Sequence, residues 1–243
     1  YDELDIIGLN INNLTCEKNK LSDQKSNVSS RIAGLERWRG ETQVYRKNGE
    51  PYLRRETITA VKNDQGKITH YVICCEDISE QKAAEDKIRE LAFYDALTGL
   101  ANRRLLNETI EKCFDEAKAK EHVGALLFID LDYFKTINDS LGHAVGDFIL
   151  ERVATRLKKM QREDYFLSRI GGDEFVLLVP QLSENPMHAE QYANLIAQQF
   201  IDVISAPYYY QGQALHIGAS VGVTLFPSRG QSPEDLLKQA DTA

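Results

Sequence analysis

Several features that define other protein classes are scarce in this sequence of 243 residues. No apolar run approaches the roughly 18 residues that cross a bilayer, and no signal-peptide pattern opens the chain. Lys and Arg total 29 against 37 Asp and Glu, so the net charge of −8 leaves no basic footprint for nucleic acid. We therefore expect no nucleic-acid partner. We also expect a cytoplasmic location, with any membrane anchor elsewhere in a longer parent protein.

Cysteine is equally scarce. The chain holds four cysteines, at positions 16, 74, 75 and 113, and they show no metal-ligand spacing. Cys74 and Cys75 are adjacent in an expected strand, so their side chains point to opposite faces. We interpret all four as reduced thiols, as expected in a cytosolic protein.

The first third of the chain ends in a pattern of three strands. Residues 41–46, 51–61 and 67–76 are rich in β-forming side chains, and turn signals separate them at Asn48-Gly49 and at residues 63–66. The pattern predicts an antiparallel meander, preceded by a polar segment over residues 17–36 that is helical in part.

A helix is expected to follow this meander. Ser79 is a suitable N-cap, and the stretch "SEQKAAEDKIRELA" contains no helix breaker. Its apolar stripe is narrow, because only Ala84, Ile88 and Leu91 fall at helical spacing. One interpretation is a linker helix that rests on a domain surface. The other is a short parallel coiled coil that joins two subunits, and three positions do not decide between them.

From about residue 92 helices and strands alternate, which predicts an α/β (α+β) domain with a central sheet flanked by helices. The helix that opens at Ser232 carries a capping-box pattern, and we expect it to continue to Ala243, so that the chain is cut within it. The remaining expected elements are a helix over 102–120, a buried strand over 125–129, a helix that buries Ile149, Val153, Leu157 and Met160, strands on both sides of Gly171-Gly172, a helix from Asn185-Pro186 to about Ser205, and a strand pair around Gln211-Gly212.

Acidic residues stand at the ends of two expected core strands. The apolar run over 125–129 ends in Asp130-Leu131-Asp132, and the stretch "SRIGGDEF" places Asp173 and Glu174 after two glycines. If these strands are neighbours, three or four carboxylates converge, and two such charges about 4 Å apart repel by roughly 1–4 kcal/mol. Hard oxygen ligands in this arrangement suit Mg²⁺ bound to substrate phosphates, which favours a metal-assisted phosphoryl transfer.

Other interpretations of these acids were weighed. Asp173-Glu174 alone is also typical of a solvated turn, in which the glycines supply a positive φ. A calcium loop of the EF-hand type starting at Asp130 fails, because Phe134 and Lys135 stand where an oxygen ligand and a glycine belong. No GxxxxGK[ST] loop is present to hold nucleotide phosphates.

Residues 92–243 resemble the GGDEF family of diguanylate cyclases. The resemblance rests on five motifs in the family's order: "DALTGLANRR" (95–104), "DLDYFKTINDSLGHAVGD" (130–147), "RIGGDEF" (169–175), "SVGVTLFP" (220–227) and "LLKQAD" (236–241). Residues before position 80 more weakly resemble a PAS sensory domain without its first strands. The expected organisation is a partial PAS domain (1–80), a helical linker (81–92) and a polymerase-palm-like GGDEF domain (93–243).

The resemblance implies a nucleotidyltransferase that condenses two GTP into cyclic di-GMP with release of pyrophosphate, using Mg²⁺ or Mn²⁺. Each subunit of a homodimer would hold one nucleotide. By motif position, Asp130, the Leu131 carbonyl, Asp173 and Glu174 would bind metal, and Glu174 is alternatively the group that activates the 3′-hydroxyl. Substrate would be bound by Phe134 and Lys135 at the phosphates, by Asn138 and Asp147 at the guanine, and by Gly171 and Gly172 beneath the nucleotide.

Departures from the family pattern keep other functions open. The family's last helix continues into a Lys and an Arg that grip the phosphates, and this chain ends before them, so it is expected to be weak or inactive as a fragment. Arg162 and Tyr165 occupy the positions of the RxxD product-inhibition motif, which puts tight feedback in doubt. One alternative is a GTP-sensing module that regulates a C-terminal phosphodiesterase domain. Another is a module that dimerises and transmits a signal, whose PAS ligand the sequence does not name.

Overall fold

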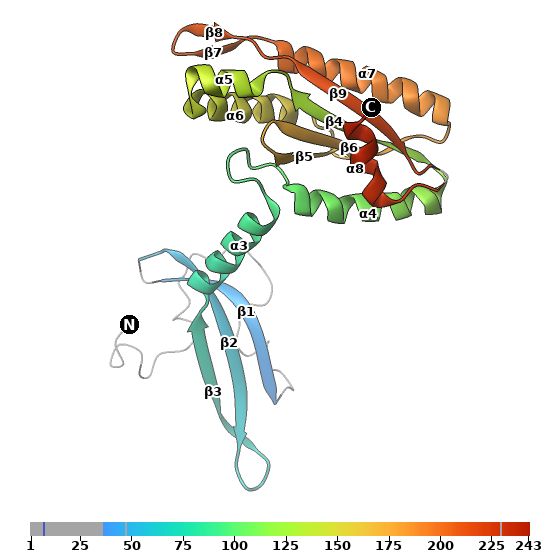
Figure 1. The fold of residues 1–243 in the computed structure, drawn as a ribbon. Coiled ribbons are helices and arrows are strands. Elements are labelled where there is room, and N and C mark those ends of the chain that lie inside the picture. Colours follow the sequence, from blue (N-terminus) through green and yellow to red (C-terminus); the bar gives the residue numbers. More distant parts are fainter. Residues whose placement is uncertain (1–6, 8–35, 47, 229) are drawn as a thin grey trace. The chain divides into compact units, whose positions relative to one another are not determined.

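The computed structural model describes Ile7 and residues 36–46, 48–228 and 230–243. The chain divides into two compact units, Tyr1–Ile88 and Arg89–Ala243, and each is considered by itself (Figure 1). The expected boundaries at residues 80 and 92 stay predictions. The expected helix within 17–36 and the cysteine at position 16 lie outside the described residues, apart from the exposed Glu36. Cys74, Cys75 and Cys113 are free thiols.

The first unit contains the expected three-stranded meander. Strands β1 (Arg37–Tyr45), β2 (Pro51–Lys62) and β3 (Ile68–Asp77) pair antiparallel in that order. Positive φ angles of 85° at Gly49 and 76° at Gly66 close the two turns, which is why glycine stands there. On β2, Ile58 is fully buried, and Glu56 is buried in an ion pair with Arg54.

Helix α3 (Ser79–Phe93) follows β3 directly. Ser79 is the first helical residue and not the N-cap that we expected, and its Oγ accepts a hydrogen bond from Leu53 N of β2 at 3.0 Å. Asp77 Oδ1 takes the capping role and accepts from Ser79 N at 3.0 Å. Ile88 and Leu91 are 68% and 60% exposed, so the structure leaves open which of the two interpretations of this helix holds.

The second unit is built on a four-stranded antiparallel sheet in the order β5-β6-β4-β9. A separate two-stranded hairpin lies outside this sheet, as expected around Gln211-Gly212. The sheet strands are β4 (Val123–Leu131), β5 (Phe166–Gly171), β6 (Glu174–Ser183) and β9 (Ala219–Phe226), and the hairpin strands are β7 (Tyr208–Tyr210) and β8 (Gln213–Leu215). The helices are α4 (Arg103–Lys120), α5 (Phe134–Leu141), α6 (His143–Met160), α7 (Pro186–Ser205) and α8 (Pro233–Asp241).

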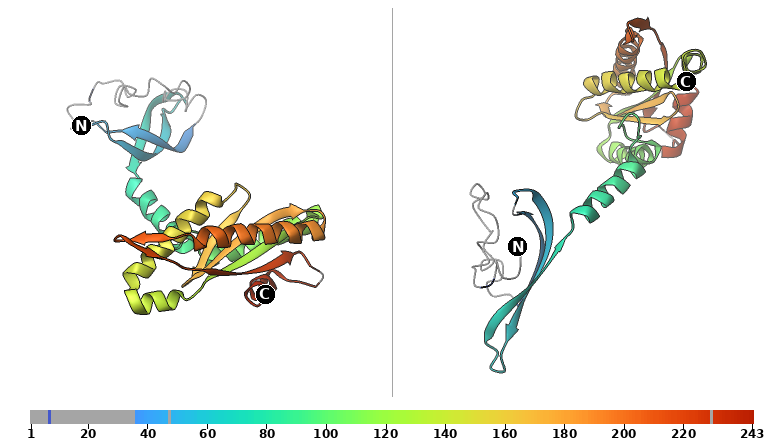
Figure 2. Two further views of the ribbon diagram at one scale, coloured as in Figure 1. Left: turned by 90° about the horizontal axis from the view of Figure 1, so that it is seen from above. Right: turned by 90° about the vertical axis from the view of Figure 1, so that its left-hand side faces the viewer.

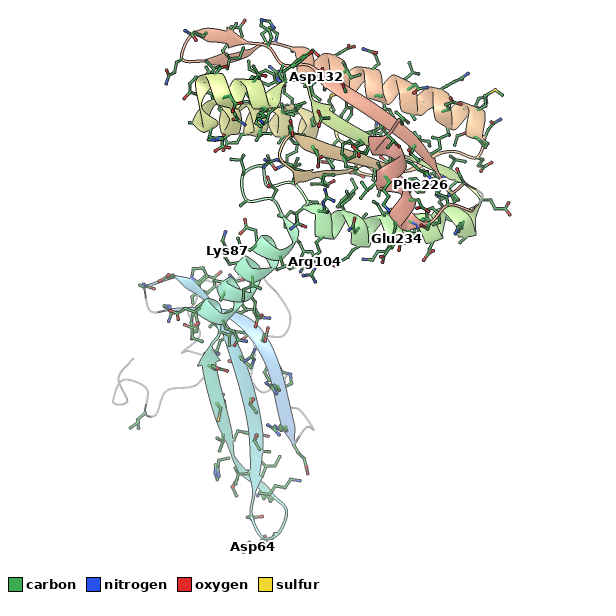
Figure 3. The ribbon with its side chains drawn as sticks, in the orientation of Figure 1. Asp64, Lys87, Arg104, Asp132, Phe226 and Glu234 are labelled. Carbon is green, nitrogen blue, oxygen red and sulfur yellow. The ribbon has the colours of Figure 1, made fainter. Side chains whose placement is uncertain are left out.

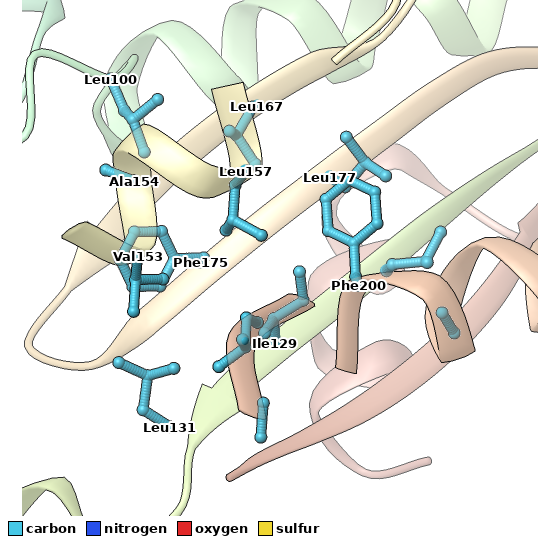
Figure 4. Packing of buried hydrophobic residues seen from close by; sticks show 14 of the residues in the cluster. Leu100, Ile129, Leu131, Val153, Ala154, Leu157, Leu167, Phe175, Leu177 and Phe200 are labelled. Carbon is cyan, nitrogen blue, oxygen red and sulfur yellow. The ribbon is translucent and has the colours of Figure 1, made fainter. Parts of the chain in front are cut away.

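Alternating side chains of β4 divide the core between the two faces of the sheet. Leu127 and Ile129 pack with α6 and α7 on one face (Figure 4), whereas Leu126 and Phe128 pack with α4 and α8 on the other. Figures 1 and 2 show these helix pairs on opposite sides of the sheet. The mixed architecture confirms the predicted fold class.

Two elements differ from expectation. Residues 134–141 form the short helix α5, where the sequence showed us only a polar, glycine-rich stretch. The capping box at Ser232 and Asp235 is confirmed, but α8 ends at Asp241 and does not continue to Ala243. Thr242 Oγ1 closes this end by donating to Lys238 O at 2.9 Å.

Gly124 is where the central strand tolerates no side chain, and this predicts the effect of a methyl group. A Cβ there would lie 2.5 Å from Phe226 Cζ, 2.6 Å from Pro180 O and 2.7 Å from Val179 O. Because two of these atoms are backbone, we expect Gly124→Ala to lower the free energy of unfolding by about 2 kcal/mol. Urea denaturation measures the loss.

A matched control is Gly212→Asn in the β7–β8 turn. A Cβ at Gly212 would meet nothing within 4 Å, and asparagine tolerates its positive φ of 84°. Equal stabilities for the wild type and Gly124→Ala would contradict the packing described for β4.

Candidate functional site

The candidate site lies beside the glycine turn, where the end of β4 pairs with the start of β6. Antiparallel register places Asp130 directly opposite Glu174, and Asp130 faces Ser220 of β9 on its other side. By alternation Asp130 shares the sheet face of Leu126 and Phe128, which is the face covered by α4 and α8. The expectation that the two acid-bearing strands are neighbours is therefore correct.

Negative charge accumulates around Asp130. Burial raises the pKa of this carboxyl, and the charges of four other acids raise it further, in the order Asp173, Glu174, Asp132 and Asp241. Among the residues that the structure describes, no three acidic, His or Cys side chains are grouped closely enough to hold a metal ion. The charges of these carboxylates thus act on Asp130, but the side chains do not converge on one point.

Asp132, the second acid of Asp130-Leu131-Asp132, has a different setting (labelled in Figure 3). Its Oδ1 accepts a hydrogen bond from Ser220 Oγ at 2.7 Å, and its backbone N donates to Gly218 O at 3.0 Å. A Cβ at Gly218 would lie 2.5 Å from Asp132 Oδ2, so glycine makes room for this carboxylate. Asp132 therefore fastens β4 to the chain at the start of β9.

The glycine turn is held by an arginine of β5, the strand that leads into it. Arg169 donates to Gly172 O from Nε at 3.0 Å and from Nη2 at 2.7 Å, and its Nη1 donates to Asp95 Oδ1 at 2.8 Å. Asp95 Oδ1 also accepts from Thr98 N at 2.9 Å and from Thr98 Oγ1 at 2.6 Å. The motif that begins at Asp95 and the motif that contains the glycines are thus one connected network. Gly172, whose φ is positive at 39°, is part of this network through its carbonyl oxygen.

A second arginine reaches the turn from the start of α4. Arg103 Nε donates to Ile170 O at 3.4 Å, and Arg103 Nη2 lies 3.6 Å from Glu174 Oε2. Arg103 lies within the motif "DALTGLANRR", which by itself predicts no role for this residue. No sequence signal reveals the contact, because Arg103 and Glu174 are brought together by tertiary structure.

The expected guanine-binding residues lie on α5 and α6. Asn138 Oδ1 is buried and has no hydrogen-bond partner, and a Cβ at Gly146 would lie only 1.9 Å from it. Glycine at 146 is therefore what allows Asn138 to turn inward. Asp147 follows Gly146 and is exposed, as is Lys135 in the first turn of α5. Phe134 is 7% exposed and its side chain packs in the core, so the ring itself is not offered to a ligand.

The positions of the product-inhibition motif do not offer an acid. Tyr165 is 8% exposed, and the guanidinium of Arg162 lies 5.6 Å from the centre of its ring. Both residues line a hollow of about 390 Å³ between the end of α6, β6 and α7. Tyr165 presents an aromatic ring to this hollow where the motif requires a carboxylate.

Comparison with known proteins identifies the family. The family model described as "Diguanylate cyclase, GGDEF domain" matches residues 92–243, and a PAS-domain model matches residues 1–80. The chain therefore belongs to the GGDEF family, and the residues that match the PAS-domain model precede those that match the GGDEF model.

Relatives and a solved structure agree with this assignment. An uncharacterized signaling protein of Caulobacter vibrioides is 38% identical over 172 residues, which are 71% of this chain and 21% of the relative. The bifunctional diguanylate cyclase/cyclic di-GMP phosphodiesterase MucR of Pseudomonas aeruginosa is 38% identical over 160 residues, or 66% of this chain and 22% of MucR. A sensory box/GGDEF family protein of Caulobacter crescentus has a TM-score of 0.57 at 37% identity, covering 62% of this chain and 94% of that structure.

The chain spans about a fifth of the length of these two curated relatives. Among the described residues, no helix has the length and apolar character needed to cross a membrane.

The network around Asp95 predicts a pH-dependent loss of stability. Burial by itself raises the pKa of Asp95, but the hydrogen bonds from Thr98 and Arg169 outweigh it, so its pKa lies below the ordinary value. A carboxyl with a lowered pKa stabilises the folded chain above the ordinary Asp pKa of about 3.9, and this contribution is lost as pH falls through the lower folded value. We expect Asp95→Asn to cost about 1–2 kcal/mol at neutral pH and progressively less below about pH 4.

Urea unfolding of wild type and variant at about pH 7 and about pH 3 measures this difference. Asp115→Asn, at an exposed position of α4, is the matched control, and its free energy of unfolding should equal that of the wild type at both pH values. If the free energies of unfolding of wild type and Asp95→Asn differ by the same amount at both pH values, the charge-dependent role of Asp95 is contradicted.

Proposed function

We propose that this chain is the catalytic half-site of a PAS-regulated diguanylate cyclase, which joins two GTP into cyclic di-GMP. The observation that carries the proposal is the register of Asp130 opposite Glu174 on one sheet face, with Asp173 in the adjoining turn. The family assignment supports it. Each 3′-hydroxyl would attack the α-phosphorus of the other nucleotide, its proton would be released, and pyrophosphate would leave.

The donor set suits a divalent metal. Asp130, Asp173 and Glu174 supply carboxylate oxygens, and the Leu131 carbonyl adds a neutral one, which is the hard-oxygen chemistry that Mg²⁺ and Mn²⁺ prefer. The raised pKa of Asp130 supports this fit, because a nearby cation would relieve the repulsion that raises it. When bound, the metal would neutralise phosphate charge and polarise the reacting phosphoryl group.

The nucleotide would extend from these acids toward α5 and α6. The unpartnered Asn138 Oδ1 fits a hydrogen-bond donor on the guanine edge, because a buried acceptor without a partner costs about 1–3 kcal/mol. Asp147 would accept from the guanine N–H groups. The backbone at Phe134 and the Lys135 ammonium would receive phosphates at the first turn of α5, where Tyr133 provides no side-chain cap.

Gly171 and Gly172 would let the nucleotide lie against the turn. A Cβ at Gly172 would meet nothing within 4 Å, so the space above the turn is open to a ligand. Glu174 would act as the second metal ligand or as the group that activates the 3′-hydroxyl. The other residues described would position the nucleotide and neutralise its charge, and these two effects supply most of the catalysis of phosphoryl transfer.

A second candidate function is GTP sensing on behalf of a phosphodiesterase domain in a longer parent protein. MucR is described as bifunctional, and this chain covers 22% of it. Tyr165 at the product-inhibition position also favours this candidate. Tight GTP binding without turnover, together with GTP-dependent activity of an attached phosphodiesterase domain, would support sensing over synthesis.

Removal of the central acid tests the proposed synthesis. The chain, with its natural continuation where one exists, is incubated with GTP and Mg²⁺, and cyclic di-GMP is measured by chromatography. We expect Asp130→Asn to reduce the rate at least about 100-fold, because it removes a charge that holds the metal. Glu151→Gln, on the exposed face of α6, is the control and should retain the wild-type rate. Absence of product from a dimeric wild type would overturn the proposal.

The guanine contact predicts a different kinetic signature. We expect Asp147→Asn to raise the KM for GTP about tenfold, because the amide replaces one acceptor of the guanine N–H groups with a donor. The Mg²⁺ concentration that gives half-maximal rate should stay unchanged, since Asp147 is not among the acids that act on Asp130. Steady-state kinetics at several Mg²⁺ concentrations separates the two effects. An unchanged KM would remove Asp147 from the guanine site.

A further inference from the structure

Arg103 contacts both strands of the glycine hairpin. Its Nε lies 3.4 Å from Ile170 O, at the end of β5, and its Nη2 lies 3.6 Å from Glu174 Oε2, at the start of β6. One guanidinium therefore spans the turn formed by Gly171, Gly172 and Asp173. A planar group with several fixed donors is suited to two acceptors at once, whereas a lysine ammonium is a single point charge.

The backbone that carries Arg103 is fixed independently of its side chain. Asn102 Oδ1 accepts from Arg104 N at 3.0 Å and from Leu105 N at 3.1 Å, which caps α4. One residue earlier, Ala101 forms a parallel bridge with Ser168, and Ala101 O accepts from Arg169 N at 2.9 Å. Arg103 thus begins a helix whose first turn is attached to β5. The side chain itself is 60% exposed, so its contacts are not a consequence of core packing.

Glu174 is a carboxylate whose orientation needs an opposing charge. It lies across from Asp130 and beside Asp173, and both neighbours repel it. The ion pair joins Arg103 Nη2 to Oε2 of Glu174, at 3.6 Å. An arginine on one oxygen can hold the carboxylate in place while the other oxygen points toward a ligand.

From this geometry we infer that Arg103 is a positioning residue for Glu174. It holds one carboxylate oxygen and the Ile170 carbonyl, and thereby presents the other carboxylate oxygen to the metal or to the 3′-hydroxyl. The inference rests on the proposed function for the identity of the reaction. The fixed hairpin and the oriented carboxylate are properties of the chain itself and are measurable without turnover.

The adjacent Arg104 provides a matched control. Its guanidinium lies 4.9 Å from the centre of the Phe93 ring, and its Nε lies 3.4 Å from Glu108 Oε1, on the solvent side of α4. Arg104→Gln and Arg103→Gln make the same chemical change at neighbouring positions of one helix. Only the second removes a contact with the hairpin.

The experiment compares wild type, Arg103→Gln, Arg103→Lys and Arg104→Gln in five measurements. These are kcat and KM for GTP, the half-saturating Mg²⁺ concentration, Mn²⁺ binding by electron paramagnetic resonance with an unreactive GTP analogue, amide exchange over residues 171–174, and the thermal midpoint of unfolding. For Arg103→Gln we expect kcat to fall and metal binding to weaken by about 10- to 100-fold, as for partners that orient a metal ligand. The KM for GTP should change less than about threefold, because the guanine contacts remain.

Arg103→Lys should recover part of the metal affinity by its charge but not the protection of the hairpin amides, since lysine lacks the second donor arm. Arg104→Gln should match the wild type in every measurement. The inference is overturned if Arg103→Gln leaves kcat and Mn²⁺ binding unchanged, or if it lowers the thermal midpoint and all kinetic constants together. A wild type that makes no cyclic di-GMP would reject the proposed function, while Mn²⁺ binding and amide exchange would still decide the role of Arg103.

Discussion

The antiparallel register between β4 and β6 is the constraint on which the rest of the site depends. It sets Asp130 against Glu174, two charges that repel, and the apolar side chains along both strands hold them there. A slip of one residue would exchange the faces of Leu127 and Phe128, and would turn the acids to the wrong side with them. Because so much apolar surface depends on this register, the fold can maintain a repulsive pair at the end of its central strands.

The second requirement is that the glycine turn stays in place despite its flexibility. Gly171 and Gly172 give the turn open space and a positive φ, and they contribute no side-chain contacts of their own. Arg169 compensates by binding the Gly172 carbonyl and Asp95, and Arg103 does so on the other side at Ile170. From outside the hairpin, Asp95 and Arg103 contact it from the segment between the end of α3 and the start of α4, and Leu131 N of β4 donates to Asp173 O at 3.3 Å. The segment that follows α3 in the chain is therefore joined to the proposed catalytic turn by tertiary contacts.

The sequence predicted the fold well where periodicity and local signals agree. The strand ending at Asp130 follows from a run of apolar residues, and the starts of α7 and α8 follow from Asn185 and from the capping box at Ser232. Helix α5 was missed because Tyr133, in a left-handed conformation at φ 57°, precedes it without a capping side chain. The contacts of Arg103 and Asp132 were also out of reach, because they join residues 71 and 88 positions apart and depend on strand register. Local pattern carries no information about such pairings.

The two sides of the site differ in how they are prepared for a ligand. On the proposed guanine side, Asn138 Oδ1 is buried without a hydrogen-bond partner over Gly146, and a donor from the ligand would relieve this unfavourable state. On the acidic side, mutual repulsion around Asp130 is relieved by a cation. The two contributions are separate, since one is a missing hydrogen bond and the other an excess of charge. Under the proposed function, a nucleotide that carries its own metal would satisfy both at once, whereas a nucleotide or a metal alone would satisfy one. Under the proposed function, a product that contains two guanosines would require a second copy of this set of residues, and the exposed Ile88 and Leu91 of α3 are apolar positions that would suit such a pairing.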